Sequence, residues 1–323
     1  MSAAEVDVVV GGPPTGSGNG SGSGNGPGSG NGSGSGNGST GSGSAVRRGR
    51  ALPLRFLRSE LAIIFGRRRN LALLGVLAAI PVLLAVAIRV SSDDGGPGGG
   101  GPGFFESITS NGLFVAFAAL AATLPLFLPL AVAAASGDAI AGEANQGTLR
   151  YLLTIPAGRT RLLFTKYVAV VIFGFAATAV VAVAGVVAGL ALFGGGDVVL
   201  LSGTTTSLLD GVGRLALSVL YLTACLAGLG AIGMFVSTLT EQPIAAIVAT
   251  IGVDVLMFIL DQIPQVSWLH PYLLVDRWTA FGDLLRDPMS GEGIVVGLLT
   301  ALAYAAVFLS AAWARFGSKD ITS

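Results

Sequence analysis

Six long apolar runs constrain this chain more than any other feature of its sequence. They cover residues 71–90, 113–135, 167–193, 215–236, 243–263 and 294–314. Each is close to the roughly 20 residues that an α-helix needs to cross a hydrocarbon core of about 30 Å. Backbone amides in lipid need partners within their own segment, and these runs lack the alternation of barrel strands. We therefore expect an all-α membrane protein with six transmembrane helices.

Composition supports this expectation. Of the 323 residues, 52% are hydrophobic and only 11% are charged, whereas a soluble domain carries about a quarter charged residues. The formal net charge is zero, which gives no reason to expect a nucleic-acid partner. In the second run, Pro125 and Pro129 lie four residues apart, and we expect a kink there because proline removes a helical hydrogen bond.

The N-terminal part differs sharply from the rest. Residues 11–44 contain only Gly, Ser, Asn, Pro and Thr, so we expect residues 1–45 to form a disordered tail. The first ten residues carry acidic but no basic side chains, which is unlike a signal peptide. Residues 46–70 combine helical apolar spacing with many arginines. This pattern predicts an amphipathic helix at the membrane interface, with Arg67–Arg69 near anionic headgroups. A soluble surface helix is the alternative.

The basic residues predict the orientation of the remaining transmembrane domain, residues 71–323. With six spans and both termini in the cytoplasm, 14 of the 18 Lys and Arg residues fall on the cytoplasmic side. The exceptions are Arg89, Arg214, Arg277 and Arg286. Short cytoplasmic loops carry such an excess of basic residues, whereas five or seven spans would place Arg315 on the wrong side.

We find no sequence signature of catalysis. Gly317-Ser318-Lys319 lacks the second glycine and the hydroxyl residue of a phosphate-binding loop. His270 and Cys225 are the only residues of their kinds, which argues against a histidine or cysteine metal site. Asp283, Asp287 and Glu292 resemble solvated external charge more than a carboxylate pair. We expect no enzyme activity and no metal or cofactor in this chain.

One loop, residues 137–166, carries a specific pattern. It reads E-A-N-Q-G-T-L-R-Y-L-L-T-I-P-A-G-R-T-R-L-L-F-T-K from Glu143 to Lys166. This succession resembles the signature of the permeases of type-2 ATP-binding-cassette (ABC) transporters. The resemblance extends from the basic amphipathic segment to residues 316–321.

The resemblance implies a permease subunit of an ATP-driven exporter in the plasma membrane of a prokaryote. A separate ATPase subunit would supply ATP and Mg²⁺ binding, and a second permease chain, identical or related, would complete a dimer in the bilayer. The loop would form the coupling helix that docks on the ATPase. The residues that match the signature are Glu143, Gly147, Thr148, Leu152, Pro156, Arg159 and Lys166. The alternative is that they only anchor the loop and orient the third span.

Asp254 lies in the middle of the fifth apolar run, where carboxylates are costly and often functional. A role in the substrate path or in gating and a structural hydrogen bond both remain open. Asp254 also supports a rival function, an ion-coupled secondary transporter. A third possibility is a membrane scaffold that holds a partner through the Gly/Ser tail. Residues 266–281, rich in aromatic side chains, are either a re-entrant segment or a surface loop.

Overall fold

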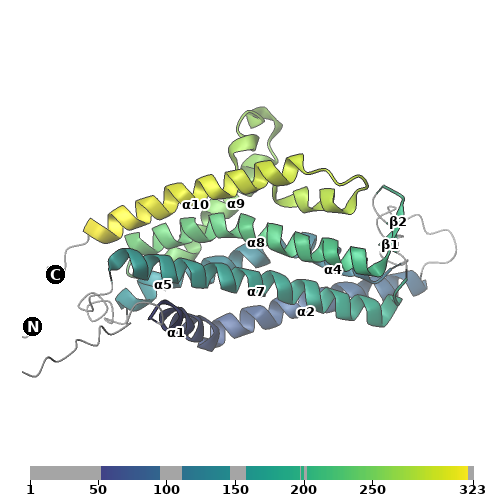
Figure 1. The fold of residues 1–323 in the computed structure, drawn as a ribbon, viewed down its shortest axis with the longest axis horizontal. Helices are drawn as coiled ribbons and strands as arrows, with labels where there is room; N and C mark the ends of the chain where they lie inside the picture. The colour runs from purple at the N-terminus through teal and green to yellow at the C-terminus, as the bar shows by residue number, and fades with distance from the viewer. Residues whose placement is uncertain (1–51, 95–110, 146–157, 197, 200–201, 319–323) are drawn as a thin grey trace, which may run out of the picture. The chain divides into compact units, whose positions relative to one another are not determined.

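The computed structural model describes residues 52–94, 111–145, 158–196, 198–199 and 202–318. They belong to one compact unit, residues 48–323, and the predicted tail lies outside them. The described part is almost entirely helical, as predicted (Figure 1). Its exception is a pair of two-residue antiparallel strands, β1 (Val198–Val199) and β2 (Thr205–Thr206), in which Val198 pairs with Thr206.

Five described helices are long and apolar enough to cross a membrane, as in a multi-pass membrane protein. They are α2 (Arg68–Asp94), α7 (Arg159–Phe193), α8 (Leu208–Leu239), α9 (Pro243–Asp261) and α10 (Glu292–Ser318). A sixth span results if α4 (Leu113–Thr123) and α5 (Phe127–Asn145) cross together. A shorter helix, α1 (Leu52–Gly66), precedes them. The segment predicted as one helix over residues 46–70 thus divides at Arg67, and residues 68–70 belong to α2.

The predicted kink in the second apolar run is a break between two helices. α4 and α5 meet at an angle of 57° across residues 124–126. Pro125 lies in this break, where its lack of an N–H group interrupts the helical ladder. Thr123 Oγ1 donates to the carbonyls of Ala119 at 2.8 Å and Leu120 at 3.2 Å, so the side chain of the last residue of α4 bonds back to its own helix. α5 then runs to Asn145, ten residues beyond the predicted end.

Two other helices are longer than the apolar runs that predicted them. α7 begins at Arg159 rather than at residue 167, and α8 begins at Leu208 rather than at residue 215. The hydroxyl of Ser207 caps α8 by accepting from the amide of Asp210 at 3.2 Å. Residues 137–166, predicted as a loop that contains a coupling helix, have helical ends, because residues 137–145 belong to α5 and residues 159–166 to α7. Residues 146–157 lie outside the described part.

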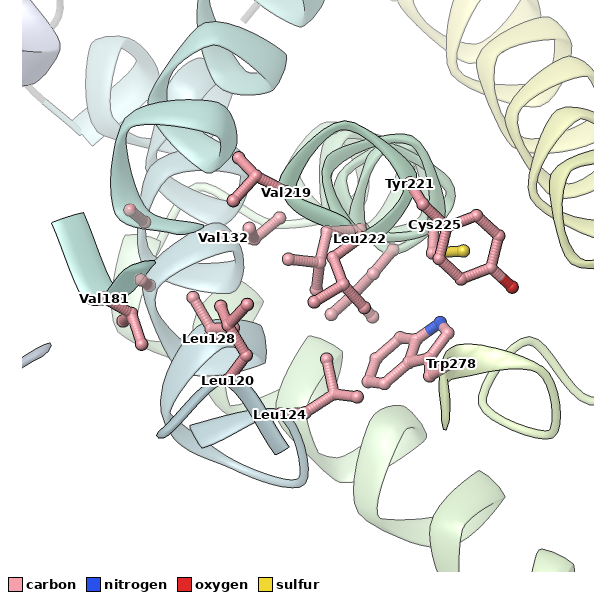
Figure 2. Packing of buried hydrophobic residues seen from close by; sticks show 14 of the residues in the cluster. Leu120, Leu124, Leu128, Val132, Val181, Val219, Tyr221, Leu222, Cys225 and Trp278 are labelled. Carbon is pink, nitrogen blue, oxygen red and sulfur yellow. The ribbon is translucent and has the colours of Figure 1, made fainter. Parts of the chain in front are cut away.

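α8 is the central helix of the bundle. It packs against α5, α7, α9 and α10, whereas α9 and α10 leave most of their surface exposed. Figure 2 shows part of the core, in which Leu222 of α8 belongs to the same buried cluster as Leu120 of α4, Leu124 of the break and Leu128 of α5. At the break Leu124 is buried, whereas Leu126 is 45% exposed. The bundle therefore covers only one side of the irregular backbone.

The described helices place different features at the two ends of the bundle (Figure 1). One end holds β1, β2 and the start of α8. The other holds α1, the end of α5, the start of α7 and the end of α10. At this second end Trp313 Nε1 of α10 donates to Thr160 Oγ1 of α7 at 2.8 Å.

The connection from α9 to α10 folds into three short 3₁₀ helices, η1 (Pro264–Val266), η2 (His270–Tyr272) and η3 (Trp278–Leu285). η3 packs against α8 and α10, and Trp278 is 1% exposed. Arg214 of α8 donates to the carbonyls of Leu284 at 2.7 Å and Arg286 at 3.0 Å. Trp268, earlier in the connection, is exposed. Part of residues 266–281 is thus packed on the bundle. The re-entrant segment and the surface loop both stay predictions.

Candidate functional site

Six charged side chains, five from four helices and one from the linker between α1 and α2, meet at the end of the bundle that holds α1. Three are acidic and three are basic, so their formal charges cancel. They are Glu60, Arg67, Arg69, Asp138, Glu143 and Lys166. We call this set the charge cluster. It joins α1, the linker to α2, α2 itself, α5 and α7.

Lys166 forms the first half of the charge cluster. Its ammonium group, on α7, donates to Glu60 Oε2 of α1 at 3.0 Å and to Glu143 Oε1 of α5. The Lys166 side chain is only 5% exposed. Charged hydrogen bonds of this kind are stronger than neutral ones, and in a buried place they are little screened by salt. One ammonium group therefore joins three helices.

Asp138 of α5 forms the second half. Its Oδ2 accepts from Arg67 in the linker between α1 and α2, and from Arg69 Nη2 of α2 at 3.1 Å. Arg69 Nη2 also donates to the carbonyl of Ala134 at 3.1 Å. Gly142 lies one turn after Asp138, and a β-carbon there would overlap the Asp138 carboxylate. A glycine at this position leaves room for the buried ion pair.

The start of α2 is fixed next to these pairs. Asn70 Nδ2 donates to the carbonyl of Ile64 at 2.9 Å, near the end of α1, and the amides of Asn70 and Leu71 bond the carbonyl of Arg67. Phe65 of α1 packs edge-on against Phe173 of α7, with 5.4 Å between ring centres. α1 is thus held by α7 as well as by the charge cluster.

α8 reaches the same region through Ser237. The hydroxyl of Ser237 donates to the carbonyl of Gly137 at 2.7 Å and accepts from the amides of Ile140 and Ala141 at 3.1 and 2.8 Å. The Ser237 hydroxyl attaches α5 to α8 beside Asp138. A side chain that inserts into the backbone hydrogen bonds of a helix in this way commonly bends that helix.

The space between the charged side chains is small. The cavity they line has a volume of about 20 Å³, roughly that of a single water molecule. The charge cluster therefore acts as a joint between helices and has no room for a nucleotide or another small substrate. Within the described residues, no group of three or more His, Cys, Asp and Glu side chains is placed to hold a metal ion.

The structure brings together two of the residues that match the permease signature. Glu143 and Lys166, the first and last residues of the pattern, form an ion pair. Gly147, Thr148, Leu152 and Pro156 lie outside the described residues. Arg159 is the first residue of α7, and its side chain is also outside the described part.

Sequence reasoning missed the other members of the charge cluster. Arg67 and Arg69 were expected near lipid headgroups, but both pair with Asp138. Glu60 belongs to the segment predicted to be amphipathic, and its side chain is buried against Lys166. A signal was present in Asp138, a carboxylate three residues after the end of an apolar run, because a carboxylate needs a cation if it is buried.

Asp254 occupies a second polar position, apart from the charge cluster. It lies in α9, is 1% exposed, and has no hydrogen-bond partner for either carboxylate oxygen among the described residues. The buried position agrees with the prediction of an intramembrane carboxylate. The partner that a structural hydrogen bond would require is not among the described side chains.

Comparison with known proteins adds a family. The profile of one protein family, "Protein of unknown function (DUF2705)", matches residues 80–322, which is most of the chain. The chain belongs to the DUF2705 family. None of the curated proteins searched matches it. The matched region begins within α2, so it includes α5, α7 and Asp254 but not α1. The description of this family names no substrate or partner.

Proposed function

We propose that this chain is the membrane-spanning permease subunit of an ATP-driven exporter of the ABC type-2 class. A separate subunit would bind ATP and Mg²⁺ and hydrolyse ATP, and no cofactor would reside in this chain. A second permease chain, identical or related, would complete the transporter. The substrate path would lie between the two permeases.

The observation that carries this proposal is the ion pair between Glu143 and Lys166. These residues lie on α5 and α7, on either side of residues 146–157, and therefore close the base of the segment that resembles a coupling helix. Glu60 ties the same base to α1. A force applied to residues 146–157 would act on several helices together, because buried charge pairs with good geometry resist separation.

The arrangement of the helices supports a topology with both termini in the cytoplasm. We count α4 and α5 as one broken span, which makes six spans. Arg67–Arg69, Arg161 and Lys166 then lie at the end of the bundle that holds α1 and the end of α10, and the positive-inside rule makes this end cytoplasmic. α1 would lie at the cytoplasmic interface, with Arg55 and Arg58 exposed.

The outer surfaces of α9 and α10 suit the bilayer or a second permease chain. They expose large aliphatic side chains along their length, including Ile244, Val248, Leu302 and Val307. A continuous apolar surface of this kind marks a membrane-facing or partner-facing region.

Purification in a mild detergent tests the proposal. The tagged chain should retain a protein with a phosphate-binding loop, identified by mass spectrometry, together with vanadate-sensitive ATPase activity. Leu152→Arg, within the proposed coupling segment, should abolish both. Leu209→Arg introduces the same charge at an 83% exposed site on the opposite end of the bundle and should abolish neither.

Two results would contradict the proposal. One is a wild-type chain that elutes without an ATPase from its native membrane. The other is an ATPase that remains bound to the Leu152→Arg chain at the wild-type ratio.

A further inference from the structure

The polar surroundings of Asp254 begin one helical turn away. Thr250 and Asp254 are four residues apart, so they share one face of α9. This face is turned towards α5 and α8, since both residues are buried and α9 packs on these two helices. A β-carbon on Gly233 of α8 would overlap the hydroxyl of Ser136 of α5 and lie 3.3 Å from the methyl carbon of Thr250, so the three helices meet closely here. We call the contact of these three helices the hydroxyl seam.

The seam runs from the charge cluster towards Asp254. Ser237 lies beside Asp138, and Ser136 and Thr250 lie deeper; all three hydroxyls are fully buried. Ser136 donates to the carbonyl of Val132 at 2.8 Å, and Thr250 donates to that of Ala246 at 2.8 Å. Ser237 already accepts from two amides, whereas the oxygens of Ser136 and Thr250 have donated their own protons but keep lone pairs that can accept. Asp254 lies one turn further along α9 than Thr250, and neither of its oxygens is hydrogen-bonded to a described residue.

No described cation neutralises Asp254. Its helix packs against α5, α8 and η1. The titratable groups on these elements and on α9 are Asp138, Glu143, Asp210, Arg214, Tyr221, Cys225 and Asp261. Asp138 and Glu143 pair with members of the charge cluster, Asp210 pairs with Arg214, and Asp261 accepts from Gln262. The only basic residue among them, Arg214, lies near the start of α8, at the end of the bundle away from the charge cluster.

We propose that Asp254 is a proton-binding site within the membrane and holds its proton in the state described here. An ionised carboxylate without a cation, buried in an apolar environment, is far more costly than the neutral acid, and such groups take up a proton instead. The neutral acid also lets α9 insert into the bilayer at a lower cost. The proton can leave only when water or a cation reaches the seam, so its release requires α9 to move against α5 and α8.

This inference does not depend on the proposed ATP-driven function. A protonated Asp254 would be equally compatible with transport driven by ATP and with transport coupled to protons. The test below measures the protonation state alone, and its failure would leave the proposal on the charge cluster untouched.

Infrared spectroscopy of the purified chain tests the inference directly. The sample is the full chain at neutral pH, in a detergent without ester groups. The wild-type spectrum minus that of Asp254→Asn should contain the carbonyl stretching band of one protonated carboxylic acid, and this band should shift in heavy water. Asp261→Asn, a less buried carboxylate at the end of the same helix, is the matched control and should not remove the band.

The opposite result is equally clear. If Asp254→Asn removes carboxylate bands and no carboxylic-acid band, Asp254 is ionised and the inference is wrong. Should the Asn variant aggregate, Asp254→Glu replaces it: the acid band should keep its intensity and change its frequency. An unchanged spectrum for folded Asp254→Glu would also contradict the inference.

Discussion

Lys166 is the residue on which the charge cluster depends most. It lies between two buried carboxylates, Glu60 and Glu143, and its ammonium group contacts both. Removing one partner of a buried ion pair leaves an uncompensated charge, which costs more than the pair contributes. Here the loss of one cation would leave two carboxylates close together.

We predict that Lys166→Met lowers the free energy of unfolding by about 3–5 kcal/mol. Arg161→Met is the matched control, because Arg161 is an exposed cation on the same helix, and its effect should stay within about 0.5 kcal/mol. Unfolding of the purified chain in detergent, followed by intrinsic fluorescence, gives both values. Adding Glu60→Gln to Lys166→Met should restore part of the loss, since it removes one of the stranded charges. Equal stability of the two single variants would contradict the role assigned to Lys166.

The sequence showed which residues are charged but not which of them meet. Glu143 and Lys166 could be singled out because both match the permease signature. Glu60 and Lys166 are 106 positions apart, and Arg67 and Asp138 are 71 apart. Their pairing depends on how α1, α5 and α7 pack together, which no local pattern encodes. Arg67 and Arg69 were placed by the general preference of basic residues for anionic headgroups, which does not take into account the carboxylate of Asp138 with which both pair.

At the scale of the helices, Ser237 is the attachment between α5 and α8. Its hydroxyl bonds three backbone groups of α5. An alanine would leave these groups without this partner in a buried place, where an unmade hydrogen bond costs about 1–3 kcal/mol.

We therefore predict a loss of about 1–3 kcal/mol of unfolding free energy for Ser237→Ala. Ser310→Ala is the control, because Ser310 is exposed and bonds only the carbonyl of Ala306 within its own helix, α10. It should change stability by less than about 0.5 kcal/mol. Chemical unfolding of both variants in the same detergent makes the comparison. A Ser237→Ala chain as stable as the wild type would show that α8 does not hold α5 through this group.

The contact between α4 and α7 depends on small residues. A β-carbon on Gly189 of α7 would overlap the carbonyl oxygen of Gly112 at the start of α4, and one on Gly185 would overlap the backbone of Ala116. Close approach of helix backbones at glycine and alanine is a common basis of helix association in membranes.

Two glycine substitutions should therefore have opposite effects. We predict that Gly189→Ala destabilises the chain by about 1–3 kcal/mol, because the added methyl group forces α4 away from α7. Gly213→Ala, in α8, has no neighbouring atom within 4 Å of the new β-carbon and should stabilise the helix by up to about 1 kcal/mol. Melting temperatures of the two purified variants decide the question, and a destabilising effect of similar size in both would contradict the packing argument.

Apolar periodicity predicted that the helices exist better than it predicted where they end. α9 begins at Pro243, as predicted, because proline is favoured in the first turn of a helix. α8 begins seven residues before its apolar run, since Asp210 and Arg214 pair across one turn and allow the helix to continue. The α4–α5 break was expected only as a kink, because the sequence marks the prolines but not the angle that packing imposes.

For the whole molecule, the topology makes a prediction that can be checked in intact cells. Cys225 is buried, so Cys225→Ser provides a cysteine-free background. A cysteine introduced by Thr204→Cys, between β1 and β2, should react with a membrane-impermeant maleimide from outside. One introduced by Arg315→Cys, near the end of α10, should react only after lysis. Labelling of both positions, or of Arg315→Cys alone, in intact cells would contradict the proposed orientation.

The central claim is that ATP turnover in a partner subunit acts on this chain through residues 146–157 and the charge cluster. Hydrogen–deuterium exchange of the co-purified complex, with and without ATP and vanadate, tests it most directly. We expect nucleotide to change the exchange of residues 137–145 and 159–166, which flank the coupling segment, and Leu152→Arg to remove this response. Flanking segments that exchange identically with and without nucleotide, in a complex that hydrolyses ATP, would contradict it.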